Sequence, residues 1–284
     1  MKIGNLAASM KVRGYAAQII IMTIIVVILL LTFIPLFLMV FLSLKSNAGI
    51  YASFWTLPIP PRFENYNAAY TRLLPNMINS LIIVTVSTAT VVTLASVSGY
   101  TFARLTFPGK QALYFAILSL MMIPGVLTLT PQFKLMQDFR LTNTWWALFF
   151  PWVAGGQVMG IMLCRTFIES QPAALFESAR IDGANELTCY FLIAMPLAKP
   201  ILTTLAIMNM NGFYNDFIWP LMVIDNTSKT VITVAIRVFQ SQTGSTQMGN
   251  MIAGFVISSV PLLVLFLFGS RLYIEGVTSG AVKM

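Results

Sequence analysis

The sequence predicts an all-α integral membrane protein with six transmembrane helices, and two observations lead to this fold class. Of its 284 residues, 57% are hydrophobic and only 9% are charged, whereas an ordinary soluble domain is about 25% charged. Long intervals of the chain carry almost no Asp, Glu, Lys or Arg, and each is close to the roughly 20 residues that a spanning helix needs. Because backbone groups in lipid must be bonded within the protein, and these intervals are too long for barrel strands, we expect helices.

Six apolar segments are the expected spans. The first is too long for the apolar region of a cleaved signal peptide, so we expect it to be retained. Proline should kink the third, fourth and fifth spans at Pro124, Pro151 and Pro220. The expected spans are Ile19–Leu44, Ser80–Ala103, Ala112–Leu129, Trp145–Leu163, Ile201–Ile224 and Met251–Tyr273.

The placement of cationic residues predicts the orientation. With a cytoplasmic N-terminus, ten of the 17 Lys and Arg residues fall on inside segments and seven on outside segments. This bias agrees with the positive-inside rule and predicts that both termini are cytoplasmic. Three connecting segments are long: residues 45–79 outside, 165–200 inside and 225–250 outside.

The composition excludes most catalytic and metal chemistry. The chain has no histidine, two cysteines and nine acidic residues, which removes Ser-His-Asp triads and histidine or four-thiolate metal sites. It also lacks the G-x-x-x-x-G-K-[ST] loop that cradles nucleotide phosphates. The net charge of +8 comes from scattered cations without a basic block, so no nucleic-acid partner is expected. We therefore predict a protein that is not an enzyme, has no catalytic or metal-ligating residue and binds no cofactor itself.

The inside segment 165–200 contains a clear helix pattern. Pro172 suits the first turn of a helix, and Gly183 suits the position after its end, where a positive φ is needed. A second helix should begin near Asn185, with Glu186 in its first turn, and should end at Pro196. The sequence thus predicts two short helices joined at a glycine.

The same segment resembles the EAA loop of ABC import permeases, whose pattern is E-A-A, three residues, G, nine residues, then I-x-L-P. Here Glu177, Gly183 and Pro196 match in spacing, while Ser178 and Met195 depart mildly from the pattern. In that family the loop forms coupling helices that seat in a groove of a cytoplasmic ATPase. The resemblance implies a type I ABC importer permease fold and the following ATPase-coupling residues: Glu177, Ser178, Ala179, Arg180, Asp182, Gly183 and Pro196.

Two further stretches resemble the carbohydrate-uptake class of these permeases, in particular the maltose-type transporters. They are NDFIWPLMVI at 215–224 and GVTSGAVK at 276–283. The likeness covers about residues 73–283. It implies an N-terminal tail, first helix and outer loop at 1–72, a permease domain at 73–273 with the coupling loop 165–200, and a cytoplasmic tail at 274–284.

The resemblance also implies partners and a location. It predicts two ABC ATPase subunits that hold ATP and Mg, a second permease subunit and an extracytoplasmic solute-binding protein, in the lipid of a bacterial cytoplasmic (inner) membrane. It further implies that the outer segment 225–250 contacts the binding protein; the alternative is a plain solvated loop. The expected contact residues are Ser241, Gln242, Thr243 and Gly244.

Polar residues interrupt the fifth span. Asn209, Asn211, Asn215 and Asp216 share an arc of about 160° on one helix, and a carboxylate near the membrane centre costs roughly 2.5–3.5 kcal/mol. One hypothesis is that they line a hydrophilic path on which amide and carboxylate groups replace water around sugar hydroxyls. The alternative is that they stabilise a kinked helix.

These inferences lead to a functional prediction: a membrane-spanning permease subunit of an ATP-driven, binding-protein-dependent carbohydrate importer that works by alternating access. The alternatives are an ABC permease for a non-sugar solute, a self-sufficient secondary transporter or channel, and a membrane scaffold. A secondary transporter should carry paired membrane carboxylates, whereas Asp216 is the only acid within an expected span.

Overall fold

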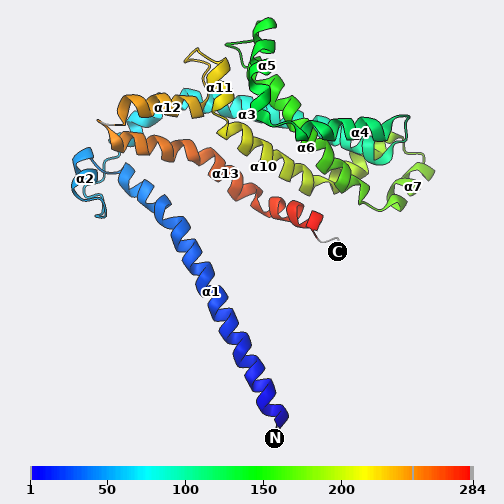
Figure 1. The fold of residues 1–284 in the computed structure, drawn as a ribbon, viewed down its shortest axis with the longest axis horizontal. Helices are drawn as coiled ribbons and strands as arrows, with labels where there is room; N and C mark the ends of the chain where they lie inside the picture. Colours follow the sequence, from blue (N-terminus) through cyan, green and yellow to red (C-terminus); the bar gives the residue numbers. More distant parts are fainter. Residues whose placement is uncertain (1, 245, 282–284) are drawn as a thin grey trace. The chain divides into compact units, whose positions relative to one another are not determined.

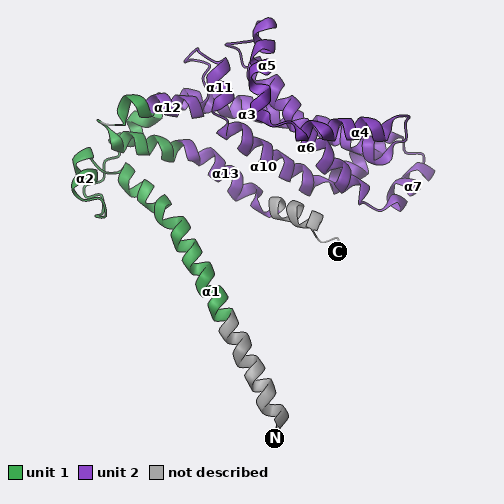
Figure 2. Cartoon of the chain, in the orientation of Figure 1, with its two compact units in different colours: residues 1–71, 240–257 green, residues 72–239, 258–284 purple. Residues whose placement is uncertain are grey.

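The computed structural model describes residues 2–244 and 246–281, with side chains described for 18–244 and 246–271. Over this part of the chain it consists of helices and their connections, without a strand. The chain forms two compact units, residues 1–71 with 240–257 and residues 72–239 with 258–284 (Figure 2). The helices up to residue 169 are, in chain order, α1 (Lys2–Ser43), α2 (Asn47–Ala52), α3 (Glu64–Arg104), α4 (Lys110–Ser119), η1 (Leu120–Met122), α5 (Gly125–Asp138) and α6 (Trp146–Glu169).

The remaining helices include several short ones between α6 and α10. They are α7 (Ala173–Ile181), α8 (Glu186–Thr188), η2 (Cys189–Ala194), α9 (Met195–Leu197), α10 (Lys199–Asn215), α11 (Ile218–Val223), α12 (Ile232–Thr243) and α13 (Met248–Ala281). Among the described residues, four helices are long and apolar enough to cross a membrane: Gln18–Ser43, Glu64–Arg104, Trp146–Glu169 and Met248–Arg271. Two bent helix pairs, α4–η1 with α5 and Glu186–Leu197 with α10, would raise the number to six if each is one span.

The second predicted span lies in a helix that is longer than a membrane requires. α3 has 41 residues, and at 1.5 Å per residue it is about 60 Å long, against a hydrocarbon core of about 30 Å. The predicted segment Ser80–Ala103 is the C-terminal part of α3. The charged residues of its first turns therefore lie on a helix without having to lie in lipid.

The third predicted span is broken rather than kinked. α4–η1 and α5 meet at an angle of 101°, and α5 turns sharply away from α4 (Figure 1). Ile123 has ψ 115° and Pro124 has ψ 126°, both extended. A proline disfavours helical geometry in the residue before it and lacks an N–H of its own. A kink is thus the wrong prediction for this segment, because two consecutive extended residues stop the helix completely.

The first unit is tied together by polar groups at the end of α1. Lys45 is buried, and its Nζ donates to the carbonyl oxygen of Ser53 at 2.6 Å. The Asn65 side-chain amide donates to the carbonyls of Ser43 and Lys45 at 2.7 and 2.9 Å. The carbonyl of Ser43, the last residue of α1, which has no partner in the helix itself, is satisfied in this way. The most apolar stretch of α1, in contrast, contains no buried residue and needs a non-aqueous surrounding.

The core of the second unit lies where α3, α6 and α10 pack closely together. A Cβ on Gly156 would lie 2.7 Å from the Asn209 side-chain oxygen, and one on Gly160 would lie 2.7 Å from the Ala95 Cβ. These two glycines are four residues apart on one face of α6, a spacing that lets helices in a membrane approach closely. This close packing holds α6 against both α3 and α10.

Candidate functional site: the segment between α6 and α10, and the polar face of α10

The segment after α6 forms the first predicted short helix. α7 begins after Pro172 and ends at Ile181, and Gly183 has φ 87°, a region where glycine is not strained. Gly183 N donates to Arg180 O at 3.1 Å, and Ala184 N donates to Ala179 O at 2.9 Å. This pair of bonds is the Schellman motif that closes a helix on a left-handed residue. The predicted helix and its terminating glycine are therefore confirmed.

The second helical segment begins as predicted at Asn185 and ends at Leu197, one residue after the predicted end at Pro196. The Asn185 side-chain oxygen accepts from Thr188 N at 2.8 Å and caps α8. The chain then continues through the π-helix η2 and through α9, which contains Pro196, and bends by 73° before α10. The predicted end of this helix is therefore confirmed to within one residue, and the π-helix within it was not predicted.

α7 and α8 present an outer face that mixes apolar and charged side chains. Ile181 is 86% exposed and Leu187 is 68% exposed, next to exposed Glu177 and Asp182. Phe176, on the other side of α7, is 1% exposed and packs into the core of the second unit. A helix that is anchored by one aromatic ring and exposes large apolar groups beside charges has the character of a protein-binding surface.

The predicted coupling residues fall on different sides of this surface. Glu177, Ser178 and Asp182 are exposed, whereas Ala179 is partly buried. Arg180 does not pair with Glu177, as its spacing allowed; its Nε donates to Glu186 Oε1 at 3.0 Å. This hydrogen bond raises the pKa of Arg180. Pro196 is exposed, two residues before the bend that leads into α10.

Two of the four predicted path residues on α10 are engaged in packing. Asn209 donates to Leu205 O at 2.8 Å and faces α6 at Gly156. Asp216 Oδ2 accepts from the Trp152 indole N–H at 2.8 Å, and its Oδ1 accepts from Trp219 N at 3.3 Å. Asp216 thus ends α10, caps the first turn of α11 and holds both to α6.

The other two path residues lie on the open side of the helix. Asn211 and Asn215 are exposed, and the Asn215 amide donates to the Asn211 carbonyl oxygen at 2.9 Å and to its side-chain oxygen at 3.0 Å. Asn211 also lines a cavity of about 470 Å³ between α10 and α13. The other residues that line this cavity are Ile207, Met208, Ser259, Leu262, Leu263, Leu265 and Phe266. The predicted arc therefore divides into a packed half and an open half.

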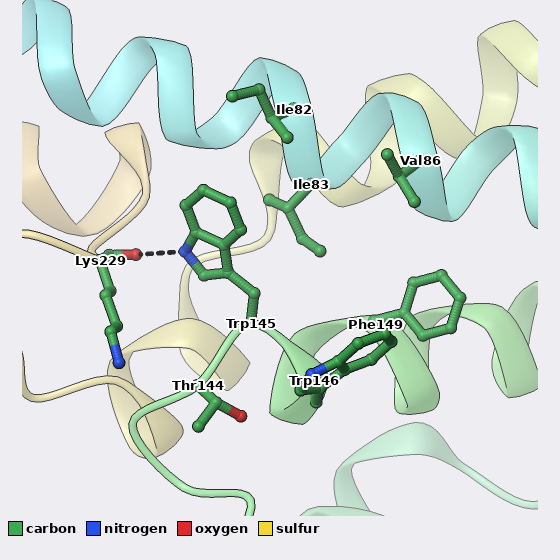
Figure 3. A pocket seen from close by; sticks show the side chains of 8 residues that line it. All are labelled: Ile82, Ile83, Val86, Thr144, Trp145, Trp146, Phe149 and Lys229. Atoms are coloured by element: carbon green, nitrogen blue, oxygen red, sulfur yellow. Dashed lines mark hydrogen bonds between the residues drawn. The ribbon is translucent and has the colours of Figure 1, made fainter.

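A second cavity, of about 510 Å³, has a different character. It lies between α3 and the start of α6, where the Trp145 indole donates to the Lys229 carbonyl at 3.1 Å (Figure 3). Ile82, Ile83, Val86, Thr144, Trp145, Trp146, Phe149 and Lys229 line it. Its walls are almost entirely hydrocarbon and aromatic ring, so they do not offer the paired donors and acceptors that sugar hydroxyls require.

The predicted binding-protein contacts lie at the end of a helix rather than in an irregular loop. Ser241, Gln242 and Thr243 are the last residues of α12, and Gly244 follows them. Ser241 and Gln242 are exposed, whereas Thr243 is buried. A Cβ on Gly244 would lie 2.6 Å from the Gln240 carbonyl, so a glycine is needed where the chain leaves the helix. The predicted tail 274–284, with the motif at 276–283, lies outside the residues whose side chains are described.

Comparison with known proteins decides the family. No family model matches the chain. The melibiose/raffinose/stachyose import permease protein MelC of Bacillus subtilis is 31% identical over 254 residues, which are 88% of this chain and 91% of MelC. The chain belongs to the ABC transporter permeases. The trehalose transport system permease protein SugB of Mycobacterium tuberculosis is 32% identical over 233 residues, which are 80% of this chain and 84% of SugB.

The fold of this permease agrees with its family. It resembles a chain of a bacterial ABC transporter involved in the import of the acidic polysaccharide alginate, with a TM-score of 0.77 and 20% identity, covering 89% of this chain and 95% of that one. The predicted membership is thus confirmed, and the permease is a transport subunit rather than an enzyme. Membership of this family excludes two of the predicted alternatives, a membrane scaffold and a self-sufficient secondary transporter.

Proposed function

We propose that this permease moves a sugar or oligosaccharide across a bacterial cytoplasmic membrane as part of an ATP-driven importer. Its relatives MelC and SugB are named for melibiose, raffinose, stachyose and trehalose, all of them sugars. The observation that carries the mechanism is the outer face of α7 and α8, which combines exposed Ile181 and Leu187 with exposed charges on a firmly anchored helix. A non-sugar solute remains the alternative cargo.

For the membrane topology, we count each bent helix pair as one transmembrane span. This gives six transmembrane helices with both termini in the cytoplasm, in agreement with the distribution of Lys and Arg. The first helix and outer loop occupy 1–72, the permease domain 73–273 and the cytoplasmic tail 274–284. The coupling loop 165–200 then lies on the cytoplasmic side, where an ATPase can reach it.

The coupling loop is the proposed docking site of an ABC ATPase. α7 is short, closed at its end by the Schellman motif and anchored by Phe176, so it can transmit a displacement without bending. The two ATPase subunits of the importer hold ATP and Mg. Closure of the ATPase pair would move the coupling loop, and the spans attached to it would alternate between inward-open and outward-open arrangements.

The open half of the α10 arc is the proposed contribution to the sugar path. Asn211 and Asn215 present amide groups on an exposed helix face that a second permease subunit would complete. Amides can donate and accept hydrogen bonds, so they can replace water around sugar hydroxyls. On the outer side, exposed Ser241 and Gln242 are the proposed contacts of an extracytoplasmic solute-binding protein.

The proposal is tested by a pair of matched substitutions. Leu187→Asp places a charge on the outer face of α8, and Leu57→Asp makes the same change at a position of similar exposure, 64% against 68%, on the expected outer side. We expect Leu187→Asp to reduce the amount of ATPase that co-purifies with the permease about tenfold or more, because a buried unpaired charge at an interface is costly. Leu57→Asp should leave the amount unchanged. Equal capture by both variants would refute the proposed docking site.

A further inference from the structure

α3 carries three polar side chains on one face, at the end of the helix near the coupling loop. Ser96, Tyr100 and Arg104 follow one another at intervals of four residues, which turns only about 40° per step around a helix. Each of the three bonds to a different part of residues 168–190. We call these three residues the α3 seam.

Arg104 holds the junction between α6 and α7. Its guanidinium donates to the carbonyl oxygens of Ile168 and Gln171, each at 2.6 Å. The same guanidinium lies 4.1 Å from the centroid of the Phe176 ring, the residue that anchors α7. Charge-assisted bonds and a cation–π contact at one position make this a strong attachment.

Tyr100 connects α3 to both helices of the coupling loop through one carboxylate. The buried Tyr100 hydroxyl donates to Glu186 Oε2 at 2.7 Å, while Glu186 Oε1 accepts from Arg180 Nε at 3.0 Å. Arg180 belongs to α7 and Glu186 to α8, so the carboxylate joins the two helices and ties them to α3. A carboxylate fixed from both sides leaves little freedom for α7 and α8 to move independently of Tyr100.

Ser96 extends the seam to the π-helix. Its hydroxyl is 2.6 Å from the Tyr190 hydroxyl in η2, and both residues are buried. The Tyr190 ring also meets the Tyr100 ring edge-on, with centroids 5.5 Å apart. The seam therefore contacts the end of α6 and each of α7, α8 and η2.

These contacts matter because α3, unlike α6 and α10, does not adjoin the coupling loop along the chain. α6 enters the loop and α10 leaves it, so both follow its displacement through the backbone, whereas α3 follows only through its packing on α6 and through the side chains that bond it to the loop itself. We propose that the α3 seam is a positioning device that makes α3 move as one body with the coupling loop, and that the Tyr100–Glu186 hydrogen bond is its central link. The inference rests on the proposed function, since it assumes that an ATPase displaces the loop.

The test measures one distance with and without nucleotide. Nitroxide labels are placed by Val97→Cys on α3 and Leu175→Cys on α7, at positions that are 45% and 43% exposed and lie outside the proposed docking face, while native Cys164 and Cys189 are fully buried and should not react. The labelled permease is purified in complex with its ATPase and second permease subunits. Pulsed electron paramagnetic resonance then gives the label distance before and after addition of Mg²⁺ and a non-hydrolysable ATP analogue.

The result expected is a constant distance in the labelled parent and a nucleotide-dependent shift or broadening in Tyr100→Phe. This change removes one hydroxyl and keeps the ring, so a merely structural role would not make the distance depend on nucleotide. Tyr114→Phe, which removes the same atom from a ring that lies 3.8 Å from the Arg165 guanidinium, should behave like the parent. If Tyr100→Phe does not assemble, Glu186→Gln weakens the same link and is expected to give the same dependence.

Two outcomes would overturn the inference while the proposed function stands: a parent distance that changes with nucleotide, or a Tyr100→Phe distance that stays constant in an assembled complex. A parent permease that never binds an ATPase would refute the proposed function, and the inference would fall with it.

Discussion

The coupling loop and the polar face of α10 lie on consecutive parts of the chain, yet different interactions determine their structures. In the loop, local chemistry decides the structure: Gly183 takes a positive φ, and Asn185 caps the next helix. On α10, each polar residue is packed where α6 lies opposite it and exposed where α6 does not. Asn209 and Asp216 meet α6, whereas Asn211 and Asn215 do not. Local signals therefore place helix ends, and only packing separates a structural asparagine from an exposed one.

The largest expected effect tests the packed half of this comparison. Gly156→Val places a Cβ 2.7 Å from the Asn209 side-chain oxygen and 2.8 Å from Val91 Cγ2, and overpacking of this kind destabilises by about 1–3 kcal/mol. We expect the midpoint temperature of thermal unfolding to fall clearly. Size-exclusion chromatography of the heated protein measures this midpoint. Gly155→Val is the matched control, since a Cβ there meets no atom within 4 Å. Equal midpoints for the two variants would contradict the close approach of α6 and α10.

Substitution of the exposed residues Asn211 and Asn215 tests the open half of the α10 arc, and its expected effect is on transport rather than on stability. In the double variant Asn211→Leu and Asn215→Leu, the hydrogen bonds lost join only these two exposed residues and their own helix. The unfolding midpoint should therefore hardly change. Uptake of radiolabelled trehalose, melibiose or raffinose should fall about tenfold or more, because sugar hydroxyls in the path would lose their partners. Met208→Leu, at another residue that lines the same cavity, should leave uptake near that of the parent. Unchanged uptake in the double variant would remove these asparagines from the path.

The sequence predicts the helical class, the apolar spans and the local form of the coupling loop, because these depend on composition and on neighbouring residues. It does not predict the break at Pro124, since a proline in an apolar span can either kink or stop a helix and the extended Ile123 decides between the two. The π-helix at Cys189–Ala194 was not predicted either, because a π-helix cannot be recognised from residue spacing.

The α3 seam was also missed, although a signal exists in the sequence. Tyr100 and Glu186 are 86 residues apart along the chain, and no local pattern joins them. Polar residues at 96, 100 and 104 do, however, lie on one face of the last turns of α3. Such a stripe indicates a polar partner, but only the folded chain identifies it as the coupling loop.

The most direct test of the central claim is a crosslink between the outer face of α7 and an ATPase. A cysteine introduced by Ile181→Cys, at the most exposed apolar position of α7, is paired with single cysteines along the groove of a candidate ATPase subunit in membranes that still import sugar. We expect a disulfide-linked permease–ATPase product whose yield changes when ATP is added. Continued import without any such product at any groove position would contradict it.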